Sequence, residues 1–393
     1  MAINPVQATY AIEESYRNYL TTTFGFKDLD LQKQFIEQLQ QPGKFLNGPI
    51  LEATPSFKTG LTIEKLIDEG ILSKEFRSLN APSLPLDRTL YLHQEKAIRK
   101  VVSHKRNIVV ATGTGSGKTE TFLIPILDYL LKEQEVGRLS PGVRALLLYP
   151  MNALANDQML RLRTLLKNYP YITFGRYTGE TENEYSKALS QYRNMFHSDP
   201  IPNELISREQ MRKKPPHILL TNYAMLEYLL LRPKDNVFFD GIYAKYWHFI
   251  VMDEVHTYSG AKGIEMAMLL RRLKERIVQS EPGRLQCIAT SATLGRGRED
   301  FPQIVHFASQ MFGEPFEWVE TDPLRQDVIE GERIPMIQPT VSWGEPEVKT
   351  YQHWKKIIDS SEKANILDEL IEVGKSNLVI CQEINFNKNK RKT

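Results

Sequence analysis

A glycine-rich loop between two apolar segments carries the clearest chemical pattern in this sequence. Residues 107–120 read NIVVATGTGSGKTE, which places Lys118 and Thr119 directly after the loop. A short β-branched run that ends abruptly at glycine is typical of a buried parallel strand. Because backbone N–H groups and a helix N-terminus then face the loop, the pattern predicts a polyphosphate site. Lys118 would reach the β- and γ-phosphates and the Thr119 hydroxyl would hold Mg²⁺. A strand-to-helix turn that needs small residues is the alternative.

Two adjacent carboxylates follow a second apolar segment. Asp253 and Glu254 come directly after residues 249–252, and His256 follows two positions later. Neighbouring carboxylates repel each other, a cost that is tolerable when Mg²⁺ lies between them and a phosphate. We expect Asp253 to hold that metal through water and Glu254 to orient or deprotonate an attacking water. In isolation the same residues would be read as a solvated acidic loop, and their order after the phosphate loop favours catalysis.

A third predicted strand, at residues 287–290, is followed by small hydroxyls. Ser291 and Thr293 flank an alanine at this strand end. The triplet alone indicates no function, and its position at the end of a predicted strand is what suggests one. We expect these hydroxyls to hydrogen-bond to His256 and to report the phosphate state to the rest of the protein.

Composition restricts the class of protein. The chain has 393 residues, 41% of them apolar, which is enough for two or three domains with real cores. Fifty basic against 48 acidic residues give a formal charge of +2, so any nucleic-acid binding must come from a local groove. Two cysteines are too few for a disulfide framework or a zinc site. The sequence shows no signal peptide and no membrane-spanning run, so we expect a cytoplasmic protein without membrane contact.

Strands and helices alternate over residues 90–294. The predicted strands are 108–111, 145–149, 218–221, 249–252 and 287–290, and the predicted helices are 118–132, 152–167, 224–231 and 260–279. This alternation predicts an α/β fold with a parallel sheet and helices on both faces. Right-handed crossovers bring the carboxyl ends of the strands to one edge, where ligands bind in open α/β sheets.

The flanking segments are predicted to be mainly helical. Helices are expected at 6–24, 29–39 and 62–69 (with Thr62 as an N-cap), at 185–196 in a surface insertion, and at 301–312 and 354–373, with a candidate strand at 377–381. The proline-containing stretch 78–87 reads as a boundary. We therefore divide the chain into a helical extension at 1–85, a nucleotide-binding domain at 86–318 and a final segment at 319–393.

These motifs, in this order, resemble those of superfamily 2 helicases. Residues 114–119, 253–256 and 291–293 are similar to motifs I, II and III of that family, with Thr112 where many members have alanine. The resemblance covers roughly residues 45–320 and is closest to the DExH branch of YprA- and Lhr-like large bacterial helicases, including helicase subunits of anti-phage defence systems. It implies a RecA-like P-loop NTPase domain that uses ATP and Mg²⁺. The implied nucleotide contacts are Gln94, Thr114, Gly115, Ser116, Gly117, Lys118 and Thr119.

The resemblance also implies contacts to nucleic acid at the remaining strand ends. The implied residues are Pro150, Asn152, Thr178, Gly179, Thr221 and Asn222. Hydroxyls, amides and helix ends suit contact with phosphates that does not depend on sequence. From the residues alone, Asn152 and Thr221 are better read as helix caps. Tyr91 and His93 either lie beside adenine or are ordinary core and surface residues.

Members of this family are implied to use a second RecA-like domain, whose arginines complete the ATP site. The sequence shows no such motif, because Arg296 and Arg298 follow the Ser-Ala-Thr triplet directly and belong to the first domain. We therefore expect the N-terminal half of a motor that needs a second RecA-like domain or a partner subunit, with residues 319–393 as a linker and the truncated start of such a domain. An arginine of this kind is worth on the order of 10³–10⁵ in rate. A DNA helicase or translocase module is favoured, and an RNA helicase module and a non-catalytic scaffold subunit stay open.

Overall fold

The computed structural model describes residues 5–41, 55–79, 81–293 and 297–334, together with 349, 352 and 355–356. The chain divides into two units, residues 1–334 and 335–393. The candidate strand at 377–381 and nearly all of the predicted helix at 354–373 lie outside the described residues. The three-part division made from the sequence stays a prediction.

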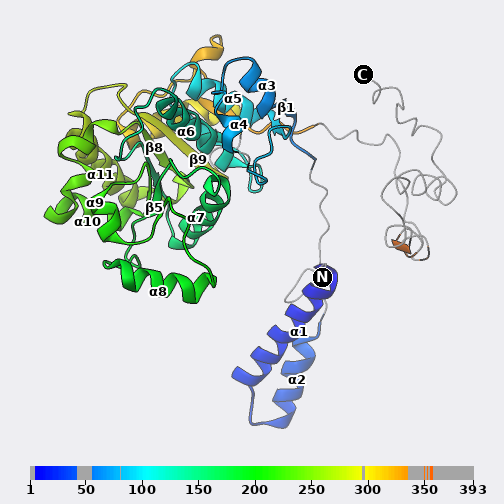
Figure 1. Cartoon of the computed structure of the whole chain (residues 1–393). Coiled ribbons are helices and arrows are strands. Elements are labelled where there is room, and N and C mark those ends of the chain that lie inside the picture. The colour runs from blue at the N-terminus through cyan, green and yellow to red at the C-terminus, as the bar shows by residue number, and fades with distance from the viewer. Residues whose placement is uncertain are drawn as a thin grey trace. The chain divides into compact units, whose positions relative to one another are not determined.

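An eight-stranded sheet forms the centre of the first unit (Figure 1). Its strand order is β10-β3-β9-β8-β4-β7-β5-β6, and neighbouring strands run parallel. The strands are β3 (Ile108–Ala111), β4 (Ala145–Leu148), β5 (Phe174–Arg176), β6 (Glu204–Leu205), β7 (Ile218–Thr221), β8 (Phe249–Met252), β9 (Gln286–Ser291) and β10 (Val328–Glu330). The carboxyl ends of the strands therefore meet at one edge, as predicted.

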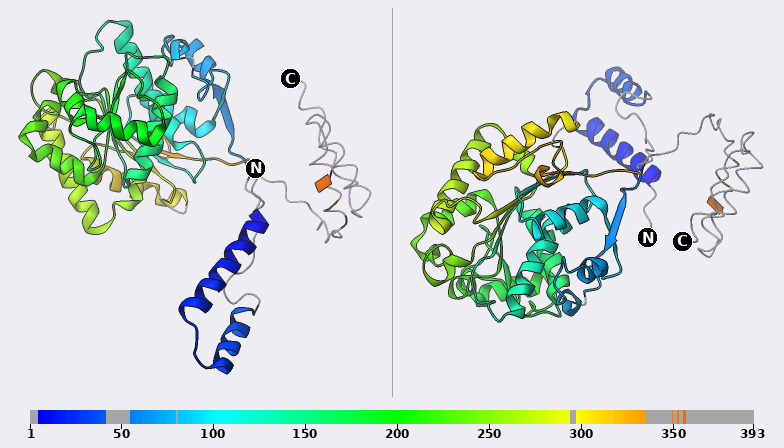
Figure 2. Two further views of the ribbon diagram at one scale, coloured as in Figure 1. Left: turned by 60° about the horizontal axis from the view of Figure 1, so that its bottom comes forward. Right: turned by 90° about the horizontal axis from the view of Figure 1, so that it is seen from above.

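Helices cover both faces of this sheet, as the two views of Figure 2 show. Successive side chains of a strand point to opposite faces, so Val110 and Leu147 enter one core and Val109 and Leu146 enter the other. The first core is closed by α5 (Leu92–Val102), α6 (Lys118–Glu135) and α7 (Asn152–Leu166). The second is closed by α9 (Arg208–Lys213), α10 (Tyr223–Leu231), α11 (Gly260–Val278) and α12 (Phe301–Phe312). The predicted α/β fold is confirmed.

Residues 59–91 pack on the first of these cores. An antiparallel pair, β1 (Thr59–Thr62) and β2 (Thr89–Tyr91), encloses α3 (Ile63–Asp68) and α4 (Phe76–Leu79). Ile63 and Phe76 lie in the same cluster as the apolar side chains of α6. Thr62 is the N-cap of α3, as predicted, because its side chain accepts a 3.2 Å hydrogen bond from the Lys65 N–H.

The remaining elements agree with the predicted helices to within a few residues. Helices α1 (Pro5–Thr23) and α2 (Leu29–Leu39) form a hairpin of their own. The insertion carries α8 (Tyr185–Phe196), whose Tyr192 hydroxyl donates to Glu204 of β6 at 3.0 Å. Short 3₁₀ helices are η1 (Pro233–Phe238), η2 (Gly241–Tyr246), η3 (Val255–Thr257), η4 (Arg298–Asp300) and η5 (Pro323–Arg325). Among the described residues, no helix is long and apolar enough to cross a membrane.

Candidate active site

Strand order sorts the predicted motifs into two neighbouring groups at the carboxyl edge. The glycine-rich loop, the Ser-Ala-Thr triplet and the Asp-Glu pair lie at the carboxyl ends of the adjacent strands β3, β9 and β8, respectively. Residues 150–152, 221–222 and 178–180 lie at the carboxyl ends of the next strands, β4, β7 and β5. One half of the edge thus carries the candidate nucleotide residues and the other half the candidate nucleic-acid residues.

The glycine-rich loop has the backbone that its glycines permit. Gly115 and Gly117 have φ values of 74° and 71°, in the left-handed region that side chains disfavour. Helix α6 begins at Lys118, so its unpaired N–H groups face the loop. The Thr112 hydroxyl lies 2.6 Å from the Ser116 hydroxyl, and both are buried. Thr112, the residue that stands where many members of the resembled family have alanine, therefore links the two ends of the loop through a buried hydrogen bond.

Lys118 and Glu254 form an ion pair across the sheet edge. Their Nζ and Oε1 atoms are 2.8 Å apart, and the side chains are 11% and 21% exposed. The second carboxylate oxygen of Glu254 accepts a 3.3 Å hydrogen bond from the Ala292 N–H. Glu254 also has a left-handed φ of 49° although it is not glycine. Strained backbone of this kind is maintained by its surroundings and concentrates at functional sites.

Asp253 is the more enclosed of the two carboxylates. Burial raises its pKa above the ordinary value, against a hydrogen bond from the Thr290 hydroxyl that lowers it. Thr119, at the start of α6, accepts a 3.4 Å hydrogen bond from Gln158. The described residues contain no group of three metal-ligating side chains that could hold an ion by themselves. One hydroxyl and one carboxylate fit Mg²⁺, which takes few protein ligands and completes its shell with water and substrate phosphate.

The predicted hydrogen bond between His256 and the triplet is confirmed at Ser291. The His256 Nδ1 lies 2.9 Å from the Ser291 hydroxyl and 3.3 Å from the Glu254 carboxylate. The Thr293 N–H donates to the same Ser291 hydroxyl at 3.2 Å. His256 thus joins the loop after β8 to the end of β9.

Two side chains of α5 hold the glycine-rich loop through its backbone. Gln94 Nε2 donates to the Gly117 carbonyl at 2.9 Å, and its Oε1 accepts from the Tyr91 N–H at 2.8 Å. His93 Nε2 lies 2.9 Å from the Ser116 carbonyl, and burial lowers the His93 pKa. His93 is therefore a buried residue that contacts the loop, and its place beside adenine stays a prediction.

The second half of the edge is a polar network across three strands. Asn222 Nδ2 donates to Asn152 Oδ1 at 2.8 Å, and Asn152 Nδ2 donates to Glu180 at 2.9 Å. Arg176, at the end of β5, donates to the other oxygen of Glu180 at 2.9 Å. Arg176 was not predicted from the sequence, where only its place at a strand end could have indicated it.

The helix-cap alternative is wrong for both residues to which it applied. Asn152 is already the first residue of α7, which has no side-chain cap. The Thr221 hydroxyl donates instead to the Tyr177 carbonyl at 2.6 Å. Asn222 is the N-cap of α10, since its side chain accepts a 2.9 Å hydrogen bond from the Met225 N–H. Thr178 is buried, with its N–H bound to the Thr181 hydroxyl at 2.9 Å.

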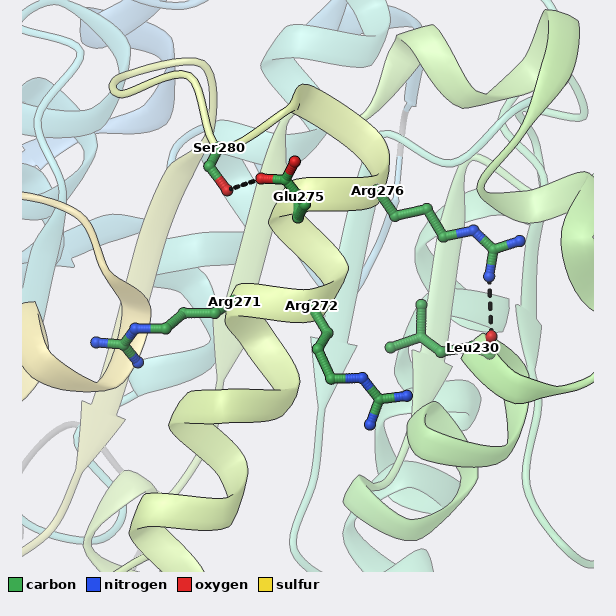
Figure 3. Close-up of a pocket in the computed structure, with 6 residues that line it drawn as sticks. All are labelled: Leu230, Arg271, Arg272, Glu275, Arg276 and Ser280. Atoms are coloured by element: carbon green, nitrogen blue, oxygen red, sulfur yellow. Dashed lines mark hydrogen bonds between the residues drawn. The ribbon is translucent and has the colours of Figure 1, made fainter.

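A separate open groove of about 690 Å³ lies between α10 and α11 (Figure 3). It is lined by Leu230, Arg271, Arg272, Glu275, Arg276 and Ser280. Arg276 donates to the Leu230 carbonyl at 2.9 Å, and Glu275 accepts from Ser280 at 2.6 Å. Both helices start at the carboxyl edge, and the groove lies at their far ends. This groove is therefore distinct from the candidate active site.

Comparisons with known proteins identify the family of this chain. The sequence profile of the DEAD/DEAH box helicase family matches residues 91–301, more than half of the chain. Druantia protein DruE of Escherichia coli is 30% identical over 72% of this chain and 20% of that protein. The ATP-dependent helicase YprA of Bacillus subtilis is 30% identical over 59% of this chain and 25% of that protein. The DNA-bound DUF1998 helicase MrfA is a similar solved structure, with a TM-score of 0.49, 22% identity, and coverage of 83% of this chain and 39% of that one. The chain thus spans about a quarter or less of the length of these two relatives. Because the family profile matches more than half of its residues, the chain belongs to the DEAD/DEAH box helicase family.

Proposed function

We propose that this chain is the ATP-binding and ATP-hydrolysing motor module of a helicase or translocase that acts on DNA. The observation that carries the proposal is the junction of three strand ends, in which Lys118 meets Glu254 and His256 meets Ser291. Family membership and similarity to proteins named ATP-dependent helicases support it. The resemblance to defence-system helicases makes anti-phage defence the proposed setting.

In this proposal the phosphates of ATP lie at the start of α6. Loop N–H groups and Lys118 donate to them, so Lys118 exchanges its Glu254 partner for a phosphate. Glu254 is then free to orient the attacking water and to accept its proton. Thr119 and Asp253 would hold Mg²⁺, which neutralises charge that develops on the phosphates.

Nucleic acid is proposed to lie along the second half of the edge. Asn152 and Asn222 present amides there, and residues 178–179 and Pro150 flank them. These groups suit the sugar–phosphate backbone and read no base, so they do not separate DNA from RNA. DNA is proposed because the sequence resembles the YprA- and Lhr-like helicases.

A second RecA-like domain or a partner subunit is proposed to close the ATP site and to supply arginine. Such a residue contributes on the order of 10³–10⁵ in rate, so weak hydrolysis is expected from this chain alone. The scaffold alternative is disfavoured because Lys118, Asp253 and Glu254 are all present and arranged together.

The test is steady-state ATP hydrolysis with no nucleic acid, with single-stranded DNA and with single-stranded RNA, on the wild type and Glu254→Gln. We expect ATP binding by both proteins and weak hydrolysis that Glu254→Gln abolishes. A greater stimulation by RNA would favour the RNA helicase module. Absence of ATP binding, or full biological function of a Lys118→Ala variant, would favour the scaffold.

A further inference from the structure

The chain that leaves the sheet after β10 runs beside the segment that precedes β1. Phe57 and Arg333 form an antiparallel bridge. On either side of it, the Lys58 N–H donates to the Glu332 carbonyl at 2.8 Å and the Ile334 N–H donates to Ser56 at 2.8 Å. Two segments that are far apart in the sequence thus pair like strands next to the glycine-rich loop.

Glu332 anchors this pairing through its side chain. Its carboxylate accepts hydrogen bonds from the ammonium groups of Lys58 at 2.9 Å and Lys96 at 2.6 Å. These contacts lower the pKa of Glu332 to about 2, so the carboxylate is ionised at neutral pH. The backbone of the next residue, Arg333, is therefore held in place on both sides.

The glycine at position 331 lets the exit segment approach the loop closely. A Cβ on Gly331 would lie 2.7 Å from the Phe57 ring and 3.0 Å from the Thr112 methyl group. Phe57 in turn lies 5.2 Å from the His93 ring and 5.5 Å from the Tyr91 ring, measured between centroids. The exit segment, an aromatic cluster and the first residue of the loop thus share one small region.

The Arg333 guanidinium faces the glycine-rich loop from this region. Its Nη1 donates to the Pro55 carbonyl at 2.9 Å, and its Cζ lies 4.7 Å from the centroid of the Phe57 ring. A Cβ on Gly113 would lie 3.7 Å from its Nη2. Arg333 is exposed, and no carboxylate within residues 297–334 or the other described segments pairs with it. A guanidinium that is held in place beside a phosphate-binding loop, without a carboxylate partner among the described residues, is suited to bind an anionic ligand.

We infer that Arg333 is a nucleotide-binding residue that donates to ribose or phosphate oxygens of ATP on the adenosine side of the loop. This inference rests on the proposed function. Strand β10 lies on the opposite side of β3 from β9 and β8, which carry Ser291 and Glu254. Arg333 therefore approaches the loop from the side held by Gln94 and His93, away from the catalytic carboxylates. It is expected to govern affinity and not the chemical step.

The test measures ATP and ADP affinity by calorimetry for the wild type, Arg333→Ala and Arg333→Lys. Loss of a charged donor predicts about ten-fold weaker binding of both nucleotides by Arg333→Ala, with partial recovery in Arg333→Lys. In turnover, KM for ATP is expected to rise while kcat stays close to wild type. The matched control is Arg325→Ala, because Arg325 is another exposed arginine, in η5 just before β10, and pairs with Glu317 at 2.6 Å. It should leave affinity unchanged.

Two results would overturn the inference. One is wild-type affinity in Arg333→Ala while Lys118→Ala loses binding, which leaves the proposed function intact. The other is a loss of affinity in Arg333→Ala that is accompanied by a lower thermal midpoint of the nucleotide-free protein, which indicates a structural role. Failure of the wild type itself to bind ATP would instead count against the proposed function.

Discussion

Lys118 Nζ lies 2.8 Å from Glu254 Oε1, so the lysine of the phosphate loop and the candidate catalytic carboxylate are each other's partner. In the proposed function, a phosphate that binds Lys118 would compete with this carboxylate, and loss of the ion pair would free Glu254 to act on water. ATP binding and activation of water would then be coupled through one ion pair.

Replacement of Glu254 by glutamine is expected to strengthen ATP binding while hydrolysis falls. The amide keeps the shape of the side chain and removes the charge that competes for Lys118, a contribution of about 1 kcal/mol or five-fold in affinity. Loss of the general base predicts a fall of about 10²–10⁴ in rate. Calorimetry and single-turnover hydrolysis check both effects, with the exposed Glu184→Gln as control. Weaker ATP binding by Glu254→Gln would contradict the competition.

Removal of the Ser291 hydroxyl is expected to reduce the stimulation of ATP hydrolysis by single-stranded DNA. Ser291 links its strand end to His256 at 2.9 Å, and His256 lies beside Glu254. A double-mutant cycle of Ser291→Ala and His256→Ala should give a coupling free energy of about 1 kcal/mol in the stimulated rate. Additive effects of the two changes would show that this hydrogen bond does not connect the two loops.

Alanine substitutions of Asn152 and Asn222 are expected to differ in their effect on the free energy of unfolding and to weaken DNA binding alike. Asn222→Ala removes the cap of α10 and should lower the free energy of unfolding by about 1 kcal/mol, whereas Asn152→Ala removes no cap. Both should weaken single-stranded DNA binding about equally for every sequence, because backbone contacts read no base. Urea unfolding and fluorescence anisotropy with two unrelated oligonucleotides check this. A sequence-selective loss would place these residues at bases.

Neutralising Asp253 is expected to stabilise the fold at neutral pH. Burial raises the pKa of Asp253, so the folded chain binds this proton more tightly than the unfolded chain. Between the ordinary carboxyl pKa and the raised value, the free energy of unfolding therefore falls as pH rises. Asp253→Asn avoids this penalty, so its free energy of unfolding at pH 7 should be about 1 kcal/mol higher than that of the wild type, while ATP hydrolysis is lost.

Thermal or urea unfolding from pH 7 downward would test the Asp253 prediction. The advantage of Asp253→Asn should shrink as the pH falls from the raised pKa to the ordinary carboxyl pKa, because the folded wild type then carries a neutral carboxyl. A comparison with Asp199→Asn, at an exposed carboxylate, separates burial from general charge. An Asn variant that is less stable than the wild type at pH 7 would refute the burial argument.

The helices and central strands were largely predictable because their signals are local. Strands β3, β7 and β8 and helices α2, α8 and α12 have the predicted bounds, and each carries its own apolar pattern and end signals. The strands β1, β2, β5, β6 and β10 were missed. They have four residues or fewer each, and their hydrogen bonds come from strands that lie elsewhere in the sequence.

The glycine-rich loop, its lysine and the carboxylates after β8 could be recognised without a structure, because each is defined by neighbouring residues. Which of these groups meet depends on the tertiary fold. The order β3-β9-β8 brings Lys118 to Glu254 across 136 positions, and pairing of the exit segment brings Glu332 to Lys58 across 274. Strand order depends on long-range hydrogen bonding and burial, which leave no trace in any short stretch of sequence. For the same reason Arg333 became a candidate only in three dimensions.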